Sequence, residues 1–489
     1  MIYRYGEFAP EIDPSAFVSE SATIIGQVKI AADCFIGPGA VIRADCGKPI
    51  VTDETIEAVS KLFGEKGSNA WYEMEAKDIL PEDFACPHCG SRTGFTKEED
   101  TLDGWFDSGS THFAAMKRDQ GFWPATVYME GLDQYRGWFQ SSLLTAVGAF
   151  GNGAPFKECI THGWTVDGEG RAMHKSLGNG VDPADIFNEN GADILRLWAA
   201  SADYHADVRC SKAIFQQLSQ NYLKFRNTCK FMLDNLVDFD PAHLTKAEDM
   251  PVLDRWLITK LNELIEKVEQ SYNDYEFHII THAVNDFCVT TLSSFYLDIV
   301  KDRLYCEAAD SAERRSAQTA LYLTLSTLAK LFAPILAFTC DEIWLAMPHT
   351  AEDDARNVVL NDMNKPFTAY ALDAETMARW EHIIEVRTAV NGALEEARAA
   401  KVIGKSLEAD VHLTVPEGDV FLADENPAAL ADLFIVSKVE LTVGGELAVK
   451  VENAAGTKCP RCWKHSLTPN AEGLCPRCAE VVRHLPDLL

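Results

Sequence analysis

Four cysteines near the end of the chain have the spacing of a closed metal site. They form two CPRC knuckles with twelve residues between them. Two such knuckles place four thiolates around one ion in a tetrahedron, which is the arrangement of a structural zinc site with no position open for catalysis. Redox CxxC motifs occur singly, so the paired motif favours zinc. The predicted ligands are Cys459, Cys462, Cys475 and Cys478.

A glycine-flanked loop in the middle of the chain carries an ammonium and a hydroxyl side by side. Its sequence, GEGRAMHKSLGNGVDP, places Lys175 next to Ser176 and ends in Asp182 and Pro183, a pair typical of a helix start. The GxxxxGK[ST] pattern of a Walker A loop is missing. The loop is nevertheless suited to bring Lys175 and Ser176 to a phosphate group.

Positive charge is concentrated in two segments of an acidic chain. The whole chain has 44 Lys+Arg against 74 Asp+Glu, a net charge of −30. Residues 209–230 contain no acidic residue, and residues 457–489 carry five basic residues, three acidic residues and Trp463. Both segments favour contact with nucleic acid; the alternatives are a solvated helix face and a ribbon that only stabilises the fold. The basic residues are Arg209, Lys212, Lys224, Arg226 and Lys230 in the first segment, and Lys458, Arg461, Lys464, Arg477 and Arg483 in the second.

Three kinds of segment must position these motifs. Residues 128–201 mix apolar strands with glycine-rich turns and helices, as in a nucleotide-binding α/β domain. From about residue 210 to 387 the apolar residues follow the period of a helix, which predicts a helix bundle. The alternation of Val411, Leu413 and Val415 predicts a strand in a small domain before the cysteine motif.

The first 45 residues follow a different period. Ile24, Ile30, Ile36 and Ile42 are six residues apart, a spacing typical of a left-handed parallel β-helix. Two ordinary hairpins are the alternative. The stretch resembles the start of gamma-class carbonic anhydrases and hexapeptide acyltransferases, but four hexads make only about one and a third turns. We therefore expect a β-helix fragment here and not a complete enzyme of that kind.

Length and composition exclude several classes of protein. A chain of 489 residues with 47% hydrophobic residues is long enough for about three cored domains. The net negative charge argues against a protein that wraps DNA. Because the sequence has no apolar window of membrane length and no signal-peptide order, we expect a cytoplasmic protein without a membrane segment. Cysteines that stand alone, such as Cys159, are expected to be buried thiols.

The lysine loop and its neighbours resemble one enzyme family. AMHKSLGN resembles the KMSKS motif of class I aminoacyl-tRNA synthetases, with Met173, Lys175 and Ser176 in register and Ala172 and His174 as departures. The segments DTLDGWFDSGSTHF, YMEGLDQYRGWFQSSL, THGWTVD and NGALEEARAAKVIGKSLEA look like isoleucyl-tRNA synthetase, and they occur in that order. The resemblance covers about residues 46–489.

The resemblance implies a ligase that joins isoleucine to tRNA(Ile). The amino-acid carboxylate would attack the α-phosphate of ATP, which is bound with Mg²⁺, and the charge of Lys175 beside Ser176 would stabilise the transition state. Such a protein is expected to be a monomer. The implied aminoacyl-adenylate site comprises Glu130, Gly131, Asp133 and Gln134, which would bind the ammonium and the ribose, together with His162 and the pocket walls Trp105 and Trp138. The alternatives are turn chemistry for the acidic pair and core packing for the tryptophans.

The resemblance also implies a fold. We expect an α/β remnant of a class I Rossmann catalytic domain, an α-helical anticodon-binding bundle, a small α+β domain and a zinc ribbon, preceded by the short β-helix-like segment. The expected boundaries are 1–45 for the hexapeptide fragment, 46–100 for a remnant of the inserted region, 101–208 for the catalytic half, 209–387 for the bundle, 388–455 for the α+β domain and 456–489 for the ribbon.

Three departures from the family limit the expected activity. No H-x-G-H motif occurs among the 13 histidines, and no inserted editing domain is present. The family's inner zinc site would use Cys46, Cys86 and Cys89, but Arg43 stands where the fourth cysteine belongs. We expect weak or absent metal there unless His88 or Cys34 substitutes. The first hypothesis is therefore a truncated isoleucine–tRNA ligase that cannot form the adenylate alone, and the alternative is a non-catalytic tRNA-binding fragment.

Overall fold

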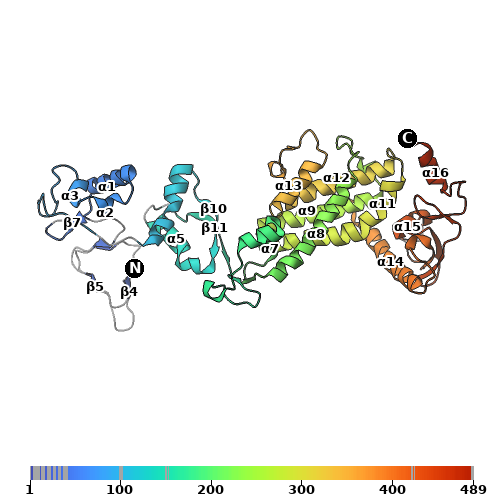
Figure 1. Cartoon of the computed structure of the whole chain (residues 1–489), viewed down its shortest axis with the longest axis horizontal. Helices are drawn as coiled ribbons and strands as arrows, with labels where there is room; N and C mark the ends of the chain where they lie inside the picture. Colours follow the sequence, from blue (N-terminus) through green and yellow to red (C-terminus); the bar gives the residue numbers. More distant parts are fainter. Residues whose placement is uncertain are drawn as a thin grey trace. The chain divides into compact units, whose positions relative to one another are not determined.

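The computed structural model divides into two compact units, Met1–Trp164 and Thr165–Leu489, and each is described by itself (Figure 1). The border between the two units falls inside the expected part 101–208, and the six-part division expected from the sequence stays a prediction. The side chains of residues 2–43, 118–120 and 175 are not among those described. The described backbone comprises residues 2–3, 11–12, 17–18, 24–25, 29–30, 35–36, 42–43, 45–98, 103–148, 151, 153–419, 422 and 425–485.

Short strands in the first 43 residues pair in parallel. Ile12 lies opposite Ile30 and Phe17 opposite Phe35, so each pair joins positions 18 residues apart, which is three hexads. Hairpins would require antiparallel pairing instead. The strands are β1 (Ile2–Tyr3), β2 (Glu11–Ile12), β3 (Phe17–Val18), β4 (Ile24–Ile25), β5 (Lys29–Ile30), β6 (Phe35–Ile36) and β7 (Ile42–Arg43), and the parallel pairs are β1 with β4, β2 with β5 and β3 with β6.

A small helical module follows these strands in the first unit. It contains α1 (Asp53–Lys66), α2 (Ala70–Glu73) and α3 (Ala76–Ile79), while β8 (Pro49–Ile50) and β9 (Thr96–Lys97) pair antiparallel with β7. The hydroxyl of Thr52 accepts a hydrogen bond from the backbone of Thr55 and so caps the start of α1. Ile50, Trp71 and Cys86 are buried in the core of this module.

The rest of the first unit is built on two long parallel strands. β10 (Ala125–Gly131) and β11 (Phe156–His162) pair from Ala125 opposite Phe156 to Gly131 opposite His162. Helix α5 (Trp138–Gly148) lies in the connection between them, as a parallel crossover requires. Helix α4 (Gly104–Gly109), the π-helical segment η1 (His112–Gln120) and the 3-10 turn η2 (Leu132–Arg136) complete this part.

The second unit opens with a short strand pair and two helices. β12 (Thr165–Val166) pairs in parallel with β13 (Val208–Arg209). Between them lie the 3-10 turn η3 (Lys175–Leu177) and helices α6 (Pro183–Asn190) and α7 (Ala192–Ser201). The carboxylate of Asp182 accepts a hydrogen bond from the backbone of Ala184, so the predicted helix start is confirmed.

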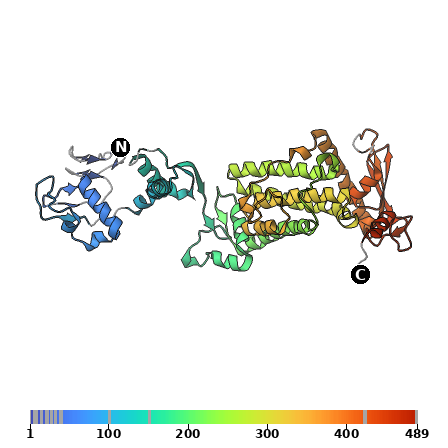
Figure 2. The same cartoon turned by 90° about the horizontal axis from the view of Figure 1, so that it is seen from above.

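A helix bundle forms most of the second unit, and its long helices run side by side in both views (Figures 1 and 2). The predicted bundle is confirmed. Helix α12 is buried over most of its length because it carries leucine, threonine and alanine on all sides. No helix among the described residues is long and apolar enough to cross a membrane. The bundle contains α8 (Lys212–Asp234), α9 (Val252–Asn273), α10 (Phe277–Asp286), π-helical η5 (Phe287–Tyr296), α11 (Leu297–Cys306), α12 (Ala312–Phe332) and α13 (Ala337–Ala346), with the 3-10 turns η4 (Ala247–Asp249), η6 (Val358–Leu360) and η7 (Thr368–Tyr370) in its connections.

A small α+β part and a cysteine ribbon follow the bundle. Strand β14 (Ala409–Val415) buries Val411, Leu413 and Val415, which confirms the predicted strand. It pairs in parallel with β15 (Lys438–Val443) and antiparallel with β16 (Ala448–Asn453). The remaining elements are α14 (Ala374–Ala399), the 3-10 turn η8 (Ser406–Glu408), α15 (Pro427–Phe434), β17 (Thr457–Lys458), β18 (His465–Ser466) and α16 (Pro476–Arg483).

Candidate functional site

The carboxyl ends of β10 and β11 bring five of the predicted adenylate-binding residues together. β10 ends in Glu130 and Gly131, the adjoining turn η2 carries Asp133 and Gln134, and β11 ends in His162 opposite Gly131. Ligands of parallel α/β sheets bind at this edge, because loops and helix starts converge there. These five residues therefore lie at one edge of the strand pair, and their role in binding an adenylate stays a prediction.

Glycine at position 131 keeps this edge open. A Cβ atom there would lie 2.7 Å from the Asp133 carboxylate and 3.8 Å from Cε1 of His162. The backbone, the carboxylate and the imidazole therefore surround one point. The Glu130 side chain is exposed at the same edge.

The imidazole of His162 is held in one tautomer. Its Nδ1 lies 2.8 Å from the carbonyl oxygen of Gly163. A carbonyl can only accept, so Nδ1 carries the proton and Nε2 is left as an acceptor. The ring is half-buried, and its orientation is fixed by its own strand end.

Gln134 and the two tryptophans have different structural roles. The side-chain oxygen of Gln134 accepts a hydrogen bond from the backbone of Trp138 at 3.0 Å, and its amide donates to Asp133 at 3.1 Å. Trp138 stacks on buried Tyr128 with ring centroids 4.2 Å apart, and its Nε1 donates to the carbonyl of Ser108. Trp105 is exposed and approaches Gly137, where a Cβ would lie 3.2 Å from its ring. Trp138 is thus half-buried and packs on Tyr128, whereas Trp105 is exposed.

The lysine loop lies in the second unit. Met173 packs against the core formed by Ile186, Ile194 and Phe215, so the apolar member of the motif anchors the loop. Lys175 and Ser176 form the one-turn helix η3 with Leu177. The hydroxyl of Ser176 donates to Nδ1 of His174 at 2.6 Å.

The four ribbon cysteines form one cluster that fits a tetrahedral metal ion. Their sulfur atoms all lie within 4.8 Å of one another, and those of Cys462 and Cys475 are 3.7 Å apart. Zinc–sulfur bonds of about 2.3 Å in a tetrahedron separate the sulfurs by a little under 4 Å. Burial opposes the thiolate of Cys459, but backbone hydrogen bonds from neighbouring residues outweigh it and lower its pKa to about 6.

The positive charges of the ribbon are directed toward the rest of the second unit. Arg477 binds Asp302 through both of its terminal nitrogens, at 2.5 and 2.8 Å, and reaches Glu307 at 2.9 Å. Lys464 pairs with Asp432, Lys458 with Glu408, and Arg461 donates to the carbonyl of Cys306. These cations dock the ribbon on the bundle and the α+β part, so the positive sum of the segment is not a free basic surface.

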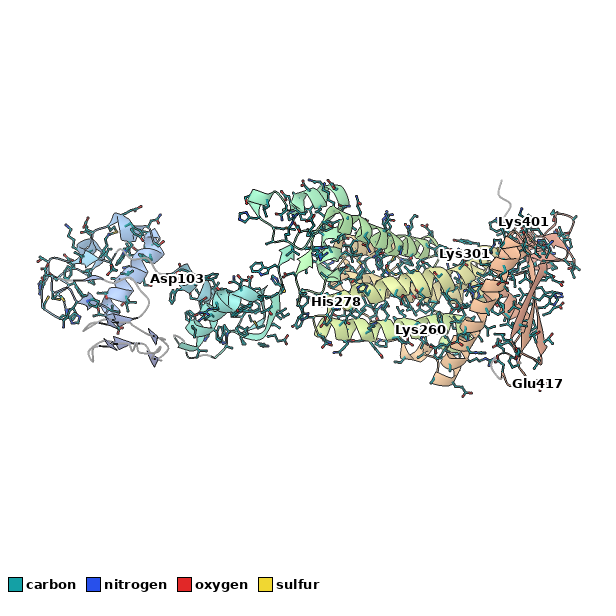
Figure 3. The ribbon with its side chains drawn as sticks, turned by 90° about the horizontal axis from the view of Figure 1, so that it is seen from below. Asp103, Lys260, His278, Lys301, Lys401 and Glu417 are labelled. Carbon is teal, nitrogen blue, oxygen red and sulfur yellow. The ribbon has the colours of Figure 1, made fainter. Side chains whose placement is uncertain are left out.

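The basic residues at the start of the bundle are different, because several remain exposed. Lys224 and Arg226 of α8 are exposed, and the ion pairs of the described residues include neither side chain. Lys224 and Lys301 line opposite sides of a groove with Thr228 and Ser293; Lys301 is labelled in Figure 3. Lys301 pairs with Asp298, and the hydroxyls of Thr228 and Ser293 lie 3.0 Å apart, so Lys224 is the ammonium of this groove that stands outside the ion pairs of the described residues. An ammonium group of that kind suits a phosphate.

Comparison with known proteins shows what the chain is similar to. The family model described as tRNA synthetases class I (I, L, M and V) matches residues 39–211, and the one described as anticodon-binding domain of tRNA ligase matches residues 254–413. A curated isoleucine–tRNA ligase of Moorella thermoacetica is 47% identical over 468 residues, and one of Desulforamulus reducens is 48% identical over 462 residues. Each alignment covers 90% of this chain. The resemblance to isoleucyl-tRNA synthetase is confirmed.

The chain spans about half the length of the curated ligases it matches, because each alignment covers 49% of the ligase. Among solved structures, a ternary LeuRS–tRNA–LeuAMS complex of Agrobacterium radiobacter K84 aligns over 76% of this chain and 38% of that chain, with a TM-score of 0.48 and 16% identity. That similarity is too low to carry a structural inference.

The inner cysteine site of this synthetase relative has three thiols in the described region. The sulfurs of Cys46, Cys86 and Cys89 lie within 4.8 Å of one another, with Cys46 and Cys86 at 3.9 Å. His88 does not join them; its Nε2 donates to the carbonyl of Pro49 at 3.1 Å. Cys34, the other substitute considered, lies outside the described residues.

Two features of the synthetase relative differ from or extend the sequence expectations. Cys159 is exposed, so the expectation of a buried thiol is wrong there; it lies on β11, one of only two strands in its sheet within the described region. Asp167, which was not predicted to be functional, is buried at the base of the lysine loop. Two sequence signals pointed to it: it ends the synthetase-like segment THGWTVD, and it is an acceptor side chain just before the glycine-rich loop.

Proposed function

We propose that this chain is an isoleucine–tRNA ligase polypeptide that carries the adenylate-binding strand ends, the lysine loop and the tRNA-binding bundle of that enzyme. The observation that carries the proposal is the assembly of Glu130, Asp133, Gln134 and His162 at one edge of the parallel strands. Isoleucine, ATP with Mg²⁺ and tRNA(Ile) are the proposed ligands, and a cytoplasmic monomer is the proposed form.

The chemistry asked of these side chains is charge stabilisation. The exposed Glu130 carboxylate would pair with the isoleucine ammonium, and Asp133, oriented by Gln134, would accept hydrogen bonds from the ribose hydroxyls. Nε2 of His162 would accept from the adenylate. Lys175 would neutralise charge that develops on the phosphates as pyrophosphate leaves. Trp105 is proposed as a pocket wall and Trp138 as its support.

Adenylate formation is proposed to need a second polypeptide. Parallel sheets are normally covered on both faces, yet the described strands β10 and β11 form a pair with exposed Met129 and Cys159. The sequence also has no H-x-G-H motif. We expect no isoleucine-dependent ATP–pyrophosphate exchange by the purified chain, and exchange after addition of the first half of the M. thermoacetica ligase. Exchange by the chain alone would show that the site is complete.

A tRNA-binding role without catalysis is the second candidate, and the exposed cations Lys224 and Arg226 of α8 favour it. Replacing Lys224 and Arg226 together by alanine is expected to weaken binding of tRNA about tenfold, and to lower the slope of log affinity against log salt by about two, because each cation releases counterions. Filter binding over a salt series measures both quantities.

A matched variant controls for the loss of two charges. Lys438 and Lys450 lie on the α+β sheet and each pairs with a glutamate, so their double alanine variant is expected to bind tRNA within twofold of wild type. If the two double variants weaken binding equally, the exposed cations of α8 do not contact tRNA.

Zinc is the proposed metal of the ribbon, and the inner site is proposed to hold it weakly. We expect about one tightly bound zinc per chain after dialysis against a mild chelator, measured by elemental analysis. Cys86→Ser is expected to leave that value unchanged, because three thiolates give an incomplete coordination shell. Two tightly bound equivalents would mean that a further ligand, such as Cys34, completes the inner site.

The 18-residue spacing of the parallel strand pairs supports a short β-helix of three hexads a turn in the first 43 residues. We propose the left-handed form. A crystal structure of the segment attached to the chain would test its hand.

A further inference from the structure

Two side chains close the base of the lysine loop. The Asp167 carboxylate lies just after β12, and Asn179 lies just before α6. The amide of Asn179 donates to Asp167 at 2.9 Å. Asp167 and Asn179 are 12 positions apart, and residues 172–176, which align with KMSKS, lie between them.

Both carboxylate oxygens of Asp167 accept hydrogen bonds at the base of the loop. One oxygen accepts from the backbone of Glu169 and Arg171 at 3.0 and 2.9 Å, and the other accepts from Nε of Arg171 at 2.8 Å as well as from Asn179. The residue is only 6% exposed. The hydrogen bond from Asn179, followed by those from Arg171, lowers the pKa of the carboxyl, so it stays ionised and accepts only.

Asn179 carries the closure to the residues beside Lys175. Its amide also donates to the carbonyl of Ala172 at 3.1 Å, and its oxygen accepts from the backbone of His174 at 2.9 Å. His174 in turn accepts from the backbone and hydroxyl of Ser176 at 3.2 and 2.6 Å. An unbroken series of hydrogen bonds therefore runs from Asp167 to Ser176.

The loop needs such a closure because of its composition. Gly170 and Gly178 have φ values of +84° and +60°, in the left-handed region that other residues rarely adopt. Glycine-rich backbone has a large conformational entropy when it is free, so without fixed contacts the loop would sample many forms. Met173 anchors one side chain in the core but does not fix the backbone on either side of Lys175.

We propose that Asp167 and Asn179 are positioning residues that fix the backbone around Lys175 so that this residue is presented to the phosphates of ATP. The inference rests on the proposed function for the identity of the ligand, and on the hydrogen bonds above for the closure itself. Neither side chain needs to touch the nucleotide.

Hydrogen exchange of the full chain, followed by mass spectrometry, tests the closure without reference to activity. In Asn179→Ala, the peptide containing His174 and Ser176 is expected to exchange at least tenfold faster than in wild type. The amide of His174 loses the Asn179 oxygen as its acceptor, and the His174 ring that accepts from the amide of Ser176 is no longer held in place. Glu169→Gln is the control: it removes only an exposed ion pair with Arg171 in the same loop, and exchange within twofold of wild type is expected. Wild-type exchange in Asn179→Ala would overturn the closure.

An isosteric variant tests whether the loop is closed by the hydrogen bond from Asn179 to Asp167 or only by the volume of the Asn179 side chain. Asn179→Asp places two carboxylates together beside Arg171, so the loop is expected to open at pH 8 as in Asn179→Ala. At pH 5 the pair can share a proton, and exchange is expected to return to within threefold of wild type at the same pH. Exchange is normalised to wild type at each pH, because the intrinsic exchange rate of an amide depends on pH. Equal exchange at both pH values would overturn the hydrogen-bond assignment.

Addition of ATP with Mg²⁺ tests positioning. ATP is expected to slow exchange of the loop peptide in wild type at least threefold, and to need at least tenfold higher concentration for the same effect in Asn179→Ala. Equal ATP protection in an opened Asn179→Ala loop would overturn the positioning role. If ATP changes nothing in wild type while Asn179→Ala still opens the loop, the closure stands and the proposed nucleotide function fails.

Discussion

Cys459→Ser is expected to unfold the ribbon of residues 456–485 while the helix bundle stays folded. In the described part of the ribbon, Cys459, Cys462 and Cys478 form a buried cluster with Cys306 of α11, and Leu474 and Cys475 pack against it. Val481 is the other buried apolar residue of this part. So small a core does not offset the conformational entropy of thirty residues. Binding of a structural zinc supplies about 10–16 kcal/mol of apparent free energy in isolated domains of this type, so folding is expected to depend on the metal.

The measurements are zinc content and tryptic cleavage after Arg461 and Arg477. Zinc is expected to fall below about a tenth of an equivalent, and cleavage at both arginines to become at least a hundredfold faster than in wild type. Wild type treated with a strong chelator should behave in the same way.

Cys306→Ala is the matched control. Cys306 is buried in the same cluster, but it lies on α11 outside the four-thiol group. This variant is expected to keep one zinc and to resist trypsin as wild type does. A Cys459→Ser ribbon that stays protected without zinc would show that its docking to the bundle suffices for folding.

Asp254→Ala is expected to lower the free energy of unfolding of the bundle by about 3–5 kcal/mol. Asp254 is fully buried in the first turn of α9. It accepts hydrogen bonds from Tyr296 at 2.8 Å, from Ser316 at 2.5 Å and from Arg303 at 3.2 and 3.3 Å. The alanine variant leaves the Arg303 guanidinium and two buried hydroxyls without their acceptor, and the uncompensated charge dominates the loss.

Urea denaturation followed by circular dichroism measures this change. Asp298→Ala is the control, because it removes a carboxylate that pairs with Lys301 on the half-exposed surface of α11, and a loss below about 1 kcal/mol is expected. If both variants lose the same stability, the buried network contributes no more than a surface pair.

Docking of the ribbon is expected to weaken in acid. Burial opposes ionisation of Asp302, but the hydrogen bonds and charge of Arg477 outweigh it and hold the carboxyl pKa below its usual value. The contribution of this pair is therefore complete above the ordinary aspartate range and is lost as the pH falls through the lowered value. Hydrogen exchange of the ribbon peptides, relative to the intrinsic rate at each pH, should become faster as the pH falls from 7 to 3, and Arg477→Ala should remove the part of this rise that the Asp302 pair contributes.

The sequence alone determined the features whose geometry depends on residues that are close together in the chain. The CxxC spacing fixes where four thiols meet, and the structure gathers Cys459, Cys462, Cys475 and Cys478 as predicted. Helical periodicity determined the bundle, and alternation determined strand β14. The synthetase-like segments identified Glu130 and His162 as candidate site residues. The parallel pairing of β10 and β11 then brings them to one edge.

The tertiary structure decided which charges are free. The sequence counts Arg477, Lys464 and Arg226 alike as cations, yet the first two are paired with carboxylates of α11 and α15 that lie 175 and 32 residues away, while Arg226 remains exposed on α8. It also decided that Trp138 packs on Tyr128 and that Asp167 and Asn179 close the lysine loop. The physical reason is that a Coulomb or hydrogen-bond contact acts over a few ångströms, and only the path of the folded chain brings distant partners within that range.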